Sequence, residues 1–508
     1  YSSAASDVYK RQTLQNLKEY ITKMNQYEHV VTLLNWDMET VMPKLGFEGH
    51  AQAMTYFSTE MFKLSTAKEL GDMLEELSRP EEFDKLDDMW QFIVKRMKRD
   101  YDENQRIPAD FYEEFVQEKS ESGNAWKEAK RASDFSIFAP HLQKIIEMTK
   151  KMAGYTNPGE EVYDVLLNQF EEGMDSATIE KLFDDLKREL VPFVQKVLAA
   201  KQPDDSRFAG KYKVEEQKKV QKLLLDYIGF NWEAGTVGET EHPFTLNFSS
   251  RDVRVTNHYY ENDAISSMYS AIHEGGHAIF EQNVNPAYDG TIAGSCRYCG
   301  IHESQSRFYE NVLGRNKNFW VPIYEKLGAL LPKFKEISLD EFYHEINHVR
   351  NSLIRTEADE LTYCFHIIIR YELEKAIFRD GVSVEELPKL WNEKMQEYLQ
   401  ITPANDAEGI LQDMHWSDGS FGYFPSYLLG NIYDGMYLEE ITKEIGDVDT
   451  ILREGRIGEI TKWLNEKIHQ YGSTRLPKEV IEKVCGKEVS AQPIIDYFKK
   501  KYTEVYNL

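Results

Sequence analysis

Two histidines and a glutamate have the types and spacing of a metal-dependent catalytic site. They lie in the sequence HEGGH at 273–277, inside the segment 264–283, where apolar residues recur at helical spacing. Residues four apart share one face of a helix, so His273 and His277 can direct both imidazoles at one metal ion. Glu274 lies about 100° further round that helix and can reach a water molecule bound to the metal. The pattern predicts a zinc site with Glu274 as the general base.

A third ligand is expected from Glu303, which lies 26 residues after His277 in the sequence GIHES at 300–304, where another helical pattern starts. Two histidines and one carboxylate leave one coordination position open for water, which is the arrangement of catalytic zinc sites. Gly275 and Gly276 would each cost an ordinary helix about 1 kcal/mol relative to Ala, so we expect another backbone to approach them closely. The alternative is a pair of histidines that only pack within a helix.

Such a site would hydrolyse a peptide or amide bond. Zinc lowers the pKa of a bound water toward about 7 and polarises the carbonyl that is attacked. Glu274 would accept the proton of that water and deliver it to the leaving amine, while the oxyanion needs the metal and at least one further donor. These residues do not separate cleavage inside a peptide from removal of a terminal residue.

Helices are expected to supply most of the framework around the site. Apolar residues recur at helical spacing in 176–198 and in 214–228, and 339–378 is expected to form one long helix because it contains no Pro or Gly. Alternating apolar residues in 241–260 predict a short strand pair. No internal repeat and no linker-like composition divides the chain. We therefore expect one mostly helical domain over 13–508, with two lobes around a cleft.

The overall composition predicts a cytoplasmic protein. The formal net charge of −26 argues against a nucleic-acid partner, which would need a basic face. There is no apolar run of about 18 residues to predict a membrane span, and the first residues lack the pattern of a secretory signal. Residues 1–12 are polar and without periodicity, and we expect an unstructured tail or a cloning or sequencing remnant there.

The four cysteines are expected to be reduced thiols, because so long a chain needs no disulfides for stability. Cys296 and Cys299 form a lone CxxC, whereas a structural zinc site takes four ligands. We interpret the pair as coincidental, and redox sensitivity near the metal site is the alternative.

Six segments follow one another in an order typical of one enzyme family. They are HPF at 242–244, DVRVT at 252–256, the HEGGH segment, HESQ at 302–305, IRTEAD at 354–359, and GILQDMHW at 409–416 with GYFP at 422–425. The order and rough spacing of these segments are similar to those of the carboxypeptidase Taq family of zinc metallocarboxypeptidases. LLNWD at 33–37 is also similar to its N-terminal region, so the resemblance covers nearly the whole chain after residue 13.

The resemblance implies a mostly α fold: a zincin-like, helical, two-lobed body around a deep active-site cleft, with a small β-hairpin or sheet near the metal site. It implies a homodimeric enzyme that acts on peptides with a free C-terminus and releases single amino acids with broad specificity, proline being disfavoured. It also implies zinc as the working metal, with cobalt as a substitute. Motif by motif, His273, His277 and Glu303 are the implied ligands and Glu274 is the implied base.

An enzyme of this kind must recognise a free carboxylate, and the family pattern implies Arg355 for this role. A guanidinium group binds a carboxylate through two hydrogen bonds and stays charged. The alternative is local, because Asp359 lies four residues on and can pair with Arg355 instead. Tyr423 and His415 are candidate donors to the oxyanion or the substrate, and each is equally well explained as part of an aromatic core. His242 is a substrate-binding candidate from its motif alone.

Metal-bound histidines usually donate their second N–H to a carboxylate or carbonyl, and the candidates for the partners are Asp252, His302 and Gln305. Two other functions also share these features. A helical zinc oligopeptidase or dipeptidyl carboxypeptidase would have the same metal residues, and a catalytically silent peptide-binding scaffold would have the same fold.

Overall fold

The computed structural model describes residues 2–203 and 206–508, and their side chains from residue 12 onward. The helices of the first half are α1 (Ser2–Thr40), α2 (Phe47–Ser65), α3 (Lys68–Leu77), α4 (Pro80–Phe83), α5 (Asp88–Gln105), α6 (Ala109–Ala132), α7 (Ala139–Thr156), α8 (Val162–Asn168), α9 (Ser176–Ala199) and α10 (Val214–Ile228). The later helices are α11 (Ala264–Gln282), α12 (Cys299–Arg307), α13 (Lys317–Trp320), α14 (Tyr324–Leu330), α15 (Leu339–Ile346), α16 (Tyr363–Lys375), α17 (Leu387–Leu399), α18 (Phe424–Ile445), α19 (Val448–Arg453), α20 (Ile457–Lys467), α21 (Pro477–Cys485) and α22 (Gln492–Tyr506). The strands are β1 (Gly235–Glu239), β2 (Thr245–Ser249) and β3 (Asp252–Asn257).

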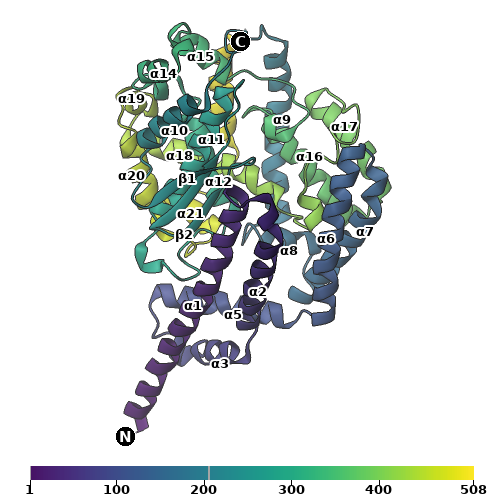
Figure 1. The fold of residues 1–508 in the computed structure, drawn as a ribbon, viewed down its shortest axis with the longest axis vertical. Coiled ribbons are helices and arrows are strands. Elements are labelled where there is room, and N and C mark those ends of the chain that lie inside the picture. Colours follow the sequence, from purple (N-terminus) through teal and green to yellow (C-terminus); the bar gives the residue numbers. More distant parts are fainter. Residues whose placement is uncertain (1, 204–205) are drawn as a thin grey trace.

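The predicted mostly helical, two-lobed fold is confirmed. In Figure 1 one lobe contains α10, α11, α14, α15 and α18–α20 together with the sheet, and the other contains α6, α7, α16 and α17. The hairpin of α1 and α2 crosses the front of the molecule in this view, with α3 and α5 below it. None of the helices in the described chain is long and apolar enough to cross a membrane.

The N-terminal helix begins earlier than expected. α1 starts at Ser2, so the prediction of an unstructured tail over 1–12 is corrected for the residues that the structure describes. The sequence from Ser2 to Thr13 contains neither Gly nor Pro, and without such a stop the helix that is buried at Leu17 and Ile21 can continue toward the N-terminus.

The sheet near the metal-site helix has three strands in the order β1-β3-β2. The expected strand pair is β2 and β3, which run antiparallel, and β1, which the alternation did not predict, pairs parallel to β3. Val253 and Val255 of β3 are fully buried against the core, as the period-2 pattern indicates. β2 is therefore an edge strand of this sheet.

α12 lies between two helices whose backbones approach it at glycines. A Cβ at Gly276 of α11 would lie 2.7 Å from the carbonyl oxygen of Gln305, and a Cβ at Gly430 of α18 would lie 3.1 Å from the backbone nitrogen of Ser304. The predicted backbone approach is thus found at Gly276. Gly275 faces side chains of α10 instead, one of which would lie 2.6 Å from an added Cβ. This close packing fixes how α12 sits on α11.

The chain leaves the helix between α15 and α16, so the single helix expected over 339–378 is wrong. The intervening segment carries Arg355 in the short 3-10 helix η6 (Arg355–Glu357). Asp359 accepts hydrogen bonds from the backbone N–H groups two and three residues on, and Asn347 donates to the carbonyl four residues before it. Such side chains offer the backbone an alternative to helical hydrogen bonds, which hydrophobic periodicity does not reveal.

A buried carboxyl group holds the N-terminus of α12. Glu171 Oε1 accepts a hydrogen bond from the backbone N–H of Gly300, and the hydroxyls of Ser426 and Tyr433 lie nearby. Burial raises the pKa of Glu171 from its ordinary value of 4.5 to about 8, in spite of these hydrogen-bonding groups. The folded protein therefore keeps a proton on Glu171 at neutral pH that the unfolded chain releases.

This proton predicts a pH-dependent stability difference between the wild type and Glu171→Gln. Between the ordinary pKa of Glu171 in the unfolded chain and its raised pKa in the folded protein, the folded state holds one more proton than the unfolded state. In this range the unfolding free energy of the wild type falls by about 1.4 kcal/mol for each pH unit. Gln keeps an acceptor for Gly300 and cannot ionise. The melting temperature of the wild type should therefore fall relative to that of the variant as the pH rises from about 5 to about 8. Parallel melting curves across this range would contradict the raised pKa.

Candidate metal centre

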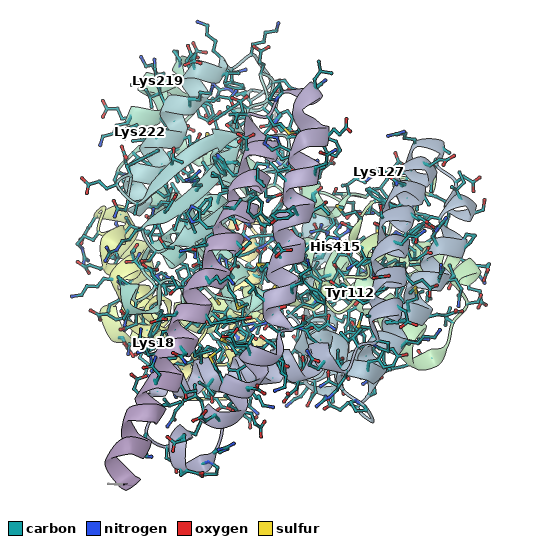
Figure 2. All side chains as sticks on the ribbon, turned by 60° about the horizontal axis from the view of Figure 1, so that its bottom comes forward. Lys18, Tyr112, Lys127, Lys219, Lys222 and His415 are labelled. Atoms are coloured by element: carbon teal, nitrogen blue, oxygen red, sulfur yellow. The ribbon has the colours of Figure 1, made fainter. Side chains whose placement is uncertain are left out.

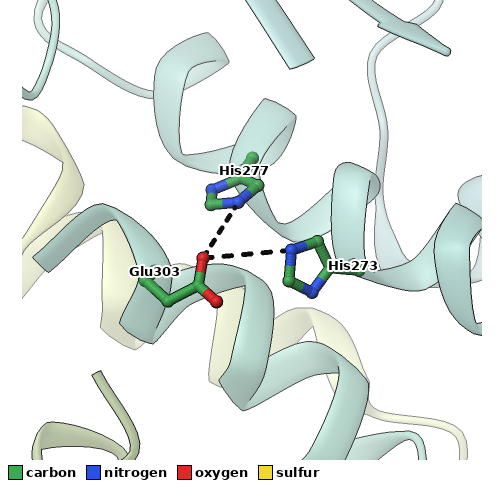
Figure 3. A group of neighbouring side chains, drawn as sticks. All are labelled: His273, His277 and Glu303. Atoms are coloured by element: carbon green, nitrogen blue, oxygen red, sulfur yellow. Dashed lines mark ion pairs between the residues drawn. The ribbon is translucent and has the colours of Figure 1, made fainter. Parts of the chain in front are cut away.

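Two histidines of α11 and a glutamate of α12 face one another (Figure 3). His277 Nε2 lies 3.5 Å from Glu303 Oε2, and His273 Nε2 lies 3.9 Å from the same oxygen. Ligand atoms around a tetrahedral zinc ion at its usual bond lengths lie about 3.3 Å apart. The three residues singled out in the sequence are therefore spaced to hold one divalent ion, and their chemistry of two imidazoles and one carboxylate fits zinc.

A second group of possible ligands lies on α6 and α7 and consists of Glu118, Glu121 and His141. Lys144 Nζ lies 2.7 Å from Glu118 Oε2, and His141 Nδ1 lies 2.8 Å from Glu118 Oε1. The ammonium group of Lys144 already neutralises the one buried carboxylate of this group and would repel a cation. The group on α11 and α12 is the better metal site in the described part of the chain.

A second carboxylate orients His273. His273 Nδ1 lies 2.8 Å from Glu310 Oε2, and donation of this N–H leaves Nε2 free for a metal. Burial alone would lower the pKa of His273, but the hydrogen bond to Glu310 and the charges of Glu303 and Glu310 raise it to about 9. A metal must therefore displace a proton at this histidine. Glu310 lies in the π-helix η4 (Phe308–Leu313), directly after α12, and the sequence reasoning missed it.

His277 is oriented by another histidine. His277 Nδ1 lies 2.5 Å from His302 Nδ1, and His302 Nε2 lies 2.8 Å from Glu281 Oε1. If His302 donates to Glu281, it accepts from His277, which leaves His277 Nε2 free for a metal. Burial and the neighbouring His302 lower the pKa of His277 to about 3, which favours the neutral imidazole that metals bind.

Of the three expected partners of the histidines, only His302 contacts one of them. Asp252 pairs with Arg254 at 2.8 Å, and Gln305 contacts His469 at 2.8 Å. The contacts of His302 and Gln305 join residues that are far apart in the sequence. Asp252 and Arg254, in contrast, are neighbours on β3. Motif membership alone therefore did not identify the partners.

An arginine holds the outer oxygen of Glu303. Arg307 Nε donates to Glu303 Oε1 at 2.6 Å, and Oε2 of the same carboxylate faces the two histidines. Burial alone would raise the pKa of Glu303, but Arg307 and the histidines hold it well below its usual range, so the group is a carboxylate. The guanidinium of Arg307 also lies over the ring of Tyr363, 4.0 Å from its centroid.

This contact predicts that Arg307 sets how Glu303 would coordinate a metal. In Arg307→Met, Oε1 is released and can join Oε2 on the ion, so a Co²⁺-substituted protein should show weaker visible absorption, as expected when the coordination number rises. Metal affinity should fall about 10- to 100-fold in Arg307→Met, as for other partners of metal ligands. The absorption and the metal affinity of Arg307→Lys should lie between those of Arg307→Met and those of the wild type. Identical Co²⁺ spectra and metal affinities for all three proteins would contradict the prediction.

Glu274, the expected base, is buried beside the histidines. Its Oε2 accepts a hydrogen bond from Thr245 Oγ1 of β2 at 2.6 Å, and Thr245 also donates to the carbonyl oxygen of Glu274. Burial raises the pKa of Glu274 above its ordinary value. A carboxylate with a fixed orientation and a raised pKa suits proton transfer.

Arg355 is buried and paired, but with a different carboxylate from the one considered. Its Nε and Nη2 donate to Asp413 Oδ1 at 3.0 and 2.9 Å, whereas Asp359 accepts from backbone groups of its own segment. The local pairing with Asp359 is therefore wrong. Arg355 Nη1 donates to the hydroxyl of Tyr363 at 3.1 Å, the same tyrosine that lies under Arg307. Contacts thus connect Arg355 to Glu303 through two side chains.

Tyr423 and His415 belong to one aromatic group. The ring of His415 lies 5.4 Å from that of Tyr423, and its Nε2 lies 3.4 Å from the hydroxyl of Tyr427. Burial lowers the pKa of His415 to about 4, so the imidazole is neutral. Burial, followed by neighbours that include Glu303, raises the pKa of Tyr423, which keeps its hydroxyl protonated.

His242 is not brought into this aromatic group by any hydrogen bond or ion pair within the described chain. It lies exposed in the loop before β2. Its substrate-binding role therefore stays a prediction.

The two cysteines of the CxxC are free thiols. Cys299 is the first residue of α12, one turn before Glu303, and burial raises its pKa to about 12. Neither of the two ligand groups in the described chain contains a cysteine. The thiol of Cys299 is therefore protonated and unreactive at neutral pH.

Comparison with known proteins gives consistent similarities over nearly the whole chain. A family model described as "Carboxypeptidase Taq (M32) metallopeptidase" matches residues 16–502. "Carboxypeptidase 1" of Bacillus subtilis is 42% identical over 96% of this chain and 98% of its own, and "Thermostable carboxypeptidase 1" of Thermus thermophilus is 34% identical over 97% and 98%. A solved M32 carboxypeptidase from Deinococcus radiodurans R1 superposes with a TM-score of 0.94 at 30% identity, covering 98% of this chain and 100% of that one.

Proposed function

The chain belongs to the carboxypeptidase Taq (M32) metallopeptidase family, and on that premise we propose that it is a zinc-dependent carboxypeptidase that releases single amino acids from peptides with a free C-terminus. The observation that carries the proposal is the convergence of His273, His277 and Glu303, from two packed helices, within the distances of one ion. Zinc suits two imidazoles and a carboxylate, and cobalt can replace it.

In the proposed reaction, His273, His277 and Glu303 would hold a divalent metal, which would supply Lewis acidity to the scissile carbonyl and to the attacking water. Glu274 accepts the proton of the attacking water and passes it to the leaving amine. The hydrogen bond from Thr245 directs Glu274 Oε2 and limits the orientations of the carboxylate.

We propose that Arg355 binds the C-terminal carboxylate of the substrate. Asp413 binds one edge of the guanidinium and holds its plane, and Nη1 on the other edge has one hydrogen bond in the described chain, to the hydroxyl of Tyr363. Tyr423 and His415 are proposed donors to the oxyanion or the substrate backbone, since both present neutral, polar tips in the same group. His242 is proposed to contact the substrate from the loop before β2.

Several finer properties are proposed from the family resemblance. They are broad specificity for the released residue with proline disfavoured, a homodimeric assembly, a cytoplasmic location, and one catalytic domain over residues 13–508. A leaving proline has no N–H to donate in the ground state and is held in a fixed ring, which is consistent with poor release.

The experiment that tests the proposed function follows the products of two matched peptides by mass spectrometry. One peptide ends in a free acid and the other is its C-terminal amide, and the metal content of the protein is measured in the same preparation. Stepwise loss of single residues from the free acid alone is expected. Internal cleavage of both peptides would identify an oligopeptidase instead, loss of dipeptides a dipeptidyl carboxypeptidase, and binding without cleavage a silent scaffold.

A further inference from the structure

A cavity of about 970 Å³ lies between α1, the β2–β3 hairpin and the loop that carries Asp289. We call it the α1 cavity. Figure 2 shows α1, with Lys18 labelled, and α2 side by side at the front of the molecule in this view. Cavities of about 300–1,000 Å³ are typical of sites that enclose a small organic ligand. The α1 cavity therefore has room for a short stretch of peptide.

The α1 cavity begins next to the residue that holds Glu274. Thr245 of β2 donates to Glu274 Oε2, and Asn247, two residues on and about 7 Å further along the same face of the strand, lines the cavity. β2 is the edge strand of the sheet, and extended peptides bind by adding to such edges. A peptide that lies along β2 past Glu274 therefore reaches the α1 cavity.

The carboxylates that line the cavity are satisfied by protein groups, with one exception among the described residues. Asp252 pairs with Arg254, and Asp289 accepts hydrogen bonds from the backbone and hydroxyl of Ser250. The carboxylate of Glu28 is exposed to the cavity and has no hydrogen bond or ion pair with the described residues. The surrounding protein raises its pKa by desolvation.

The one lysine at the cavity does not neutralise Glu28. Lys18 lies ten residues away on α1, which separates the two backbones by about 15 Å, and its Nζ lies over the ring of Trp90, 4.8 Å from the centroid. Among the described residues, Glu28 is therefore the one carboxylate of the α1 cavity that has neither a hydrogen bond nor an ion pair. A cationic ligand group would stabilise this carboxylate.

We propose that the α1 cavity binds the part of a peptide substrate that precedes the cleaved bond, and that Glu28 pairs with a cation of that part. The cation is the α-ammonium group of a short peptide or the side chain of a lysine or arginine. The proposal rests on the proposed carboxypeptidase function, because Arg355, the proposed carboxylate-binding residue, does not line the cavity. The residues that extend into the cavity are then those on the N-terminal side of the cleaved bond.

The test compares kcat/KM for matched peptides in two series. In the first, N-acetylated peptides carry one lysine at successive positions before the cleaved bond, with norleucine as its neutral partner. In the second, peptides of three to six residues have a free or an acetylated N-terminus. A charged hydrogen bond to Glu28 should give a preference of about 10-fold or more for the cationic member in at least one series, and the series that responds identifies the source of the cation.

The deciding comparison is Glu28→Gln against Glu39→Gln. The first variant removes the charge in the cavity and should bring the ratio between cationic and neutral peptides to within about two-fold. Glu39 is an exposed carboxylate on the same helix, outside the cavity, and its variant should keep the wild-type ratio. An unchanged ratio in Glu28→Gln, or no preference in the wild type at any position, would overturn the proposal.

A binding measurement separates this proposal from the proposed function. Isothermal titration of the same peptides into Glu274→Gln, with and without Glu28→Gln, reports affinity without turnover. If no peptide is cleaved by the wild type but affinity for the cationic member still depends on Glu28, the carboxypeptidase function fails and the cavity site stands. If peptides are cleaved and neither rate nor affinity depends on Glu28, the cavity site fails and the function stands.

Discussion

Glu274→Gln should keep its metal and lose roughly 10²- to 10⁴-fold in kcat/KM, the range that a positioned general acid–base group contributes. Gln has nearly the same shape, so the hydrogen bond from Thr245 and the packing of α11 remain possible, but the amide cannot accept the proton of the attacking water. The histidines and Glu303 are untouched. Metal content by mass spectrometry and rates on a free-acid peptide measure the two effects together.

Thr245→Val provides the matched comparison for this variant. It removes the donor to Glu274 Oε2 and leaves the base itself in place. We therefore expect a smaller loss of rate than in Glu274→Gln. The hydrogen bond lowers the pKa of Glu274, so its loss should move the acidic limb of the pH–rate profile to higher pH. Full activity in Glu274→Gln with bound metal would assign the proton transfer to another residue.

The metal residues could be singled out from the sequence because their geometry is local. Two histidines four residues apart on a helix converge whatever the rest of the fold does, and the glycine at position 276 indicated a close backbone that the structure identifies as α12. The prediction of Glu303 as the third ligand depended in addition on the helical pattern that starts at 300–304. The mostly helical fold with a small sheet was predictable for the same reason, since periodicity is a property of short segments.

The partners of the site could not be predicted because they depend on how helices pack. Glu310 follows Glu303 by seven residues, close to two helical turns, and this spacing was the available signal. The pairing of Arg355 with Asp413 joins residues 58 apart along the chain, and no local pattern indicates it. The break between α15 and α16 has a similar origin, because side-chain hydrogen bonds to the backbone outweigh an unbroken apolar period.

Continuous contacts connect the candidate metal centre to the proposed carboxylate site. Arg307 binds Glu303 and lies over Tyr363, and the hydroxyl of Tyr363 accepts from Arg355. Both arginines are largely buried, so their positions are set by these contacts and not by solvent. In the proposed function, the distance between a metal ion at Glu303 and a substrate carboxylate at Arg355 would decide whether one residue or two are released, and side chains that packing holds in place would set this distance.

Arg355→Ala should abolish most of the discrimination between a free C-terminal acid and its amide. Loss of a charge-assisted pair in a buried site costs about 3 kcal/mol, which corresponds to a fall of roughly 150-fold in kcat/KM for the free acid. The amide never makes that ion pair, so its rate should change much less. Arg355→Lys keeps a positive charge but cannot bind a carboxylate through two parallel hydrogen bonds. Its kcat/KM for the free acid should therefore lie between those of the wild type and Arg355→Ala.

The fold should tolerate this change, because Asp413 keeps a second partner. Arg370 Nε donates to Asp413 Oδ2 at 2.7 Å, so removing Arg355 does not leave a buried carboxylate unpaired, and a thermal melt of each variant checks this. The informative quantity is the ratio of acid to amide rates, since a general loss of stability lowers both together. A ratio in Arg355→Ala equal to that of the wild type would show that another cation reads the C-terminus. Arg254, already paired with Asp252 beside β2, would then be the next residue to substitute.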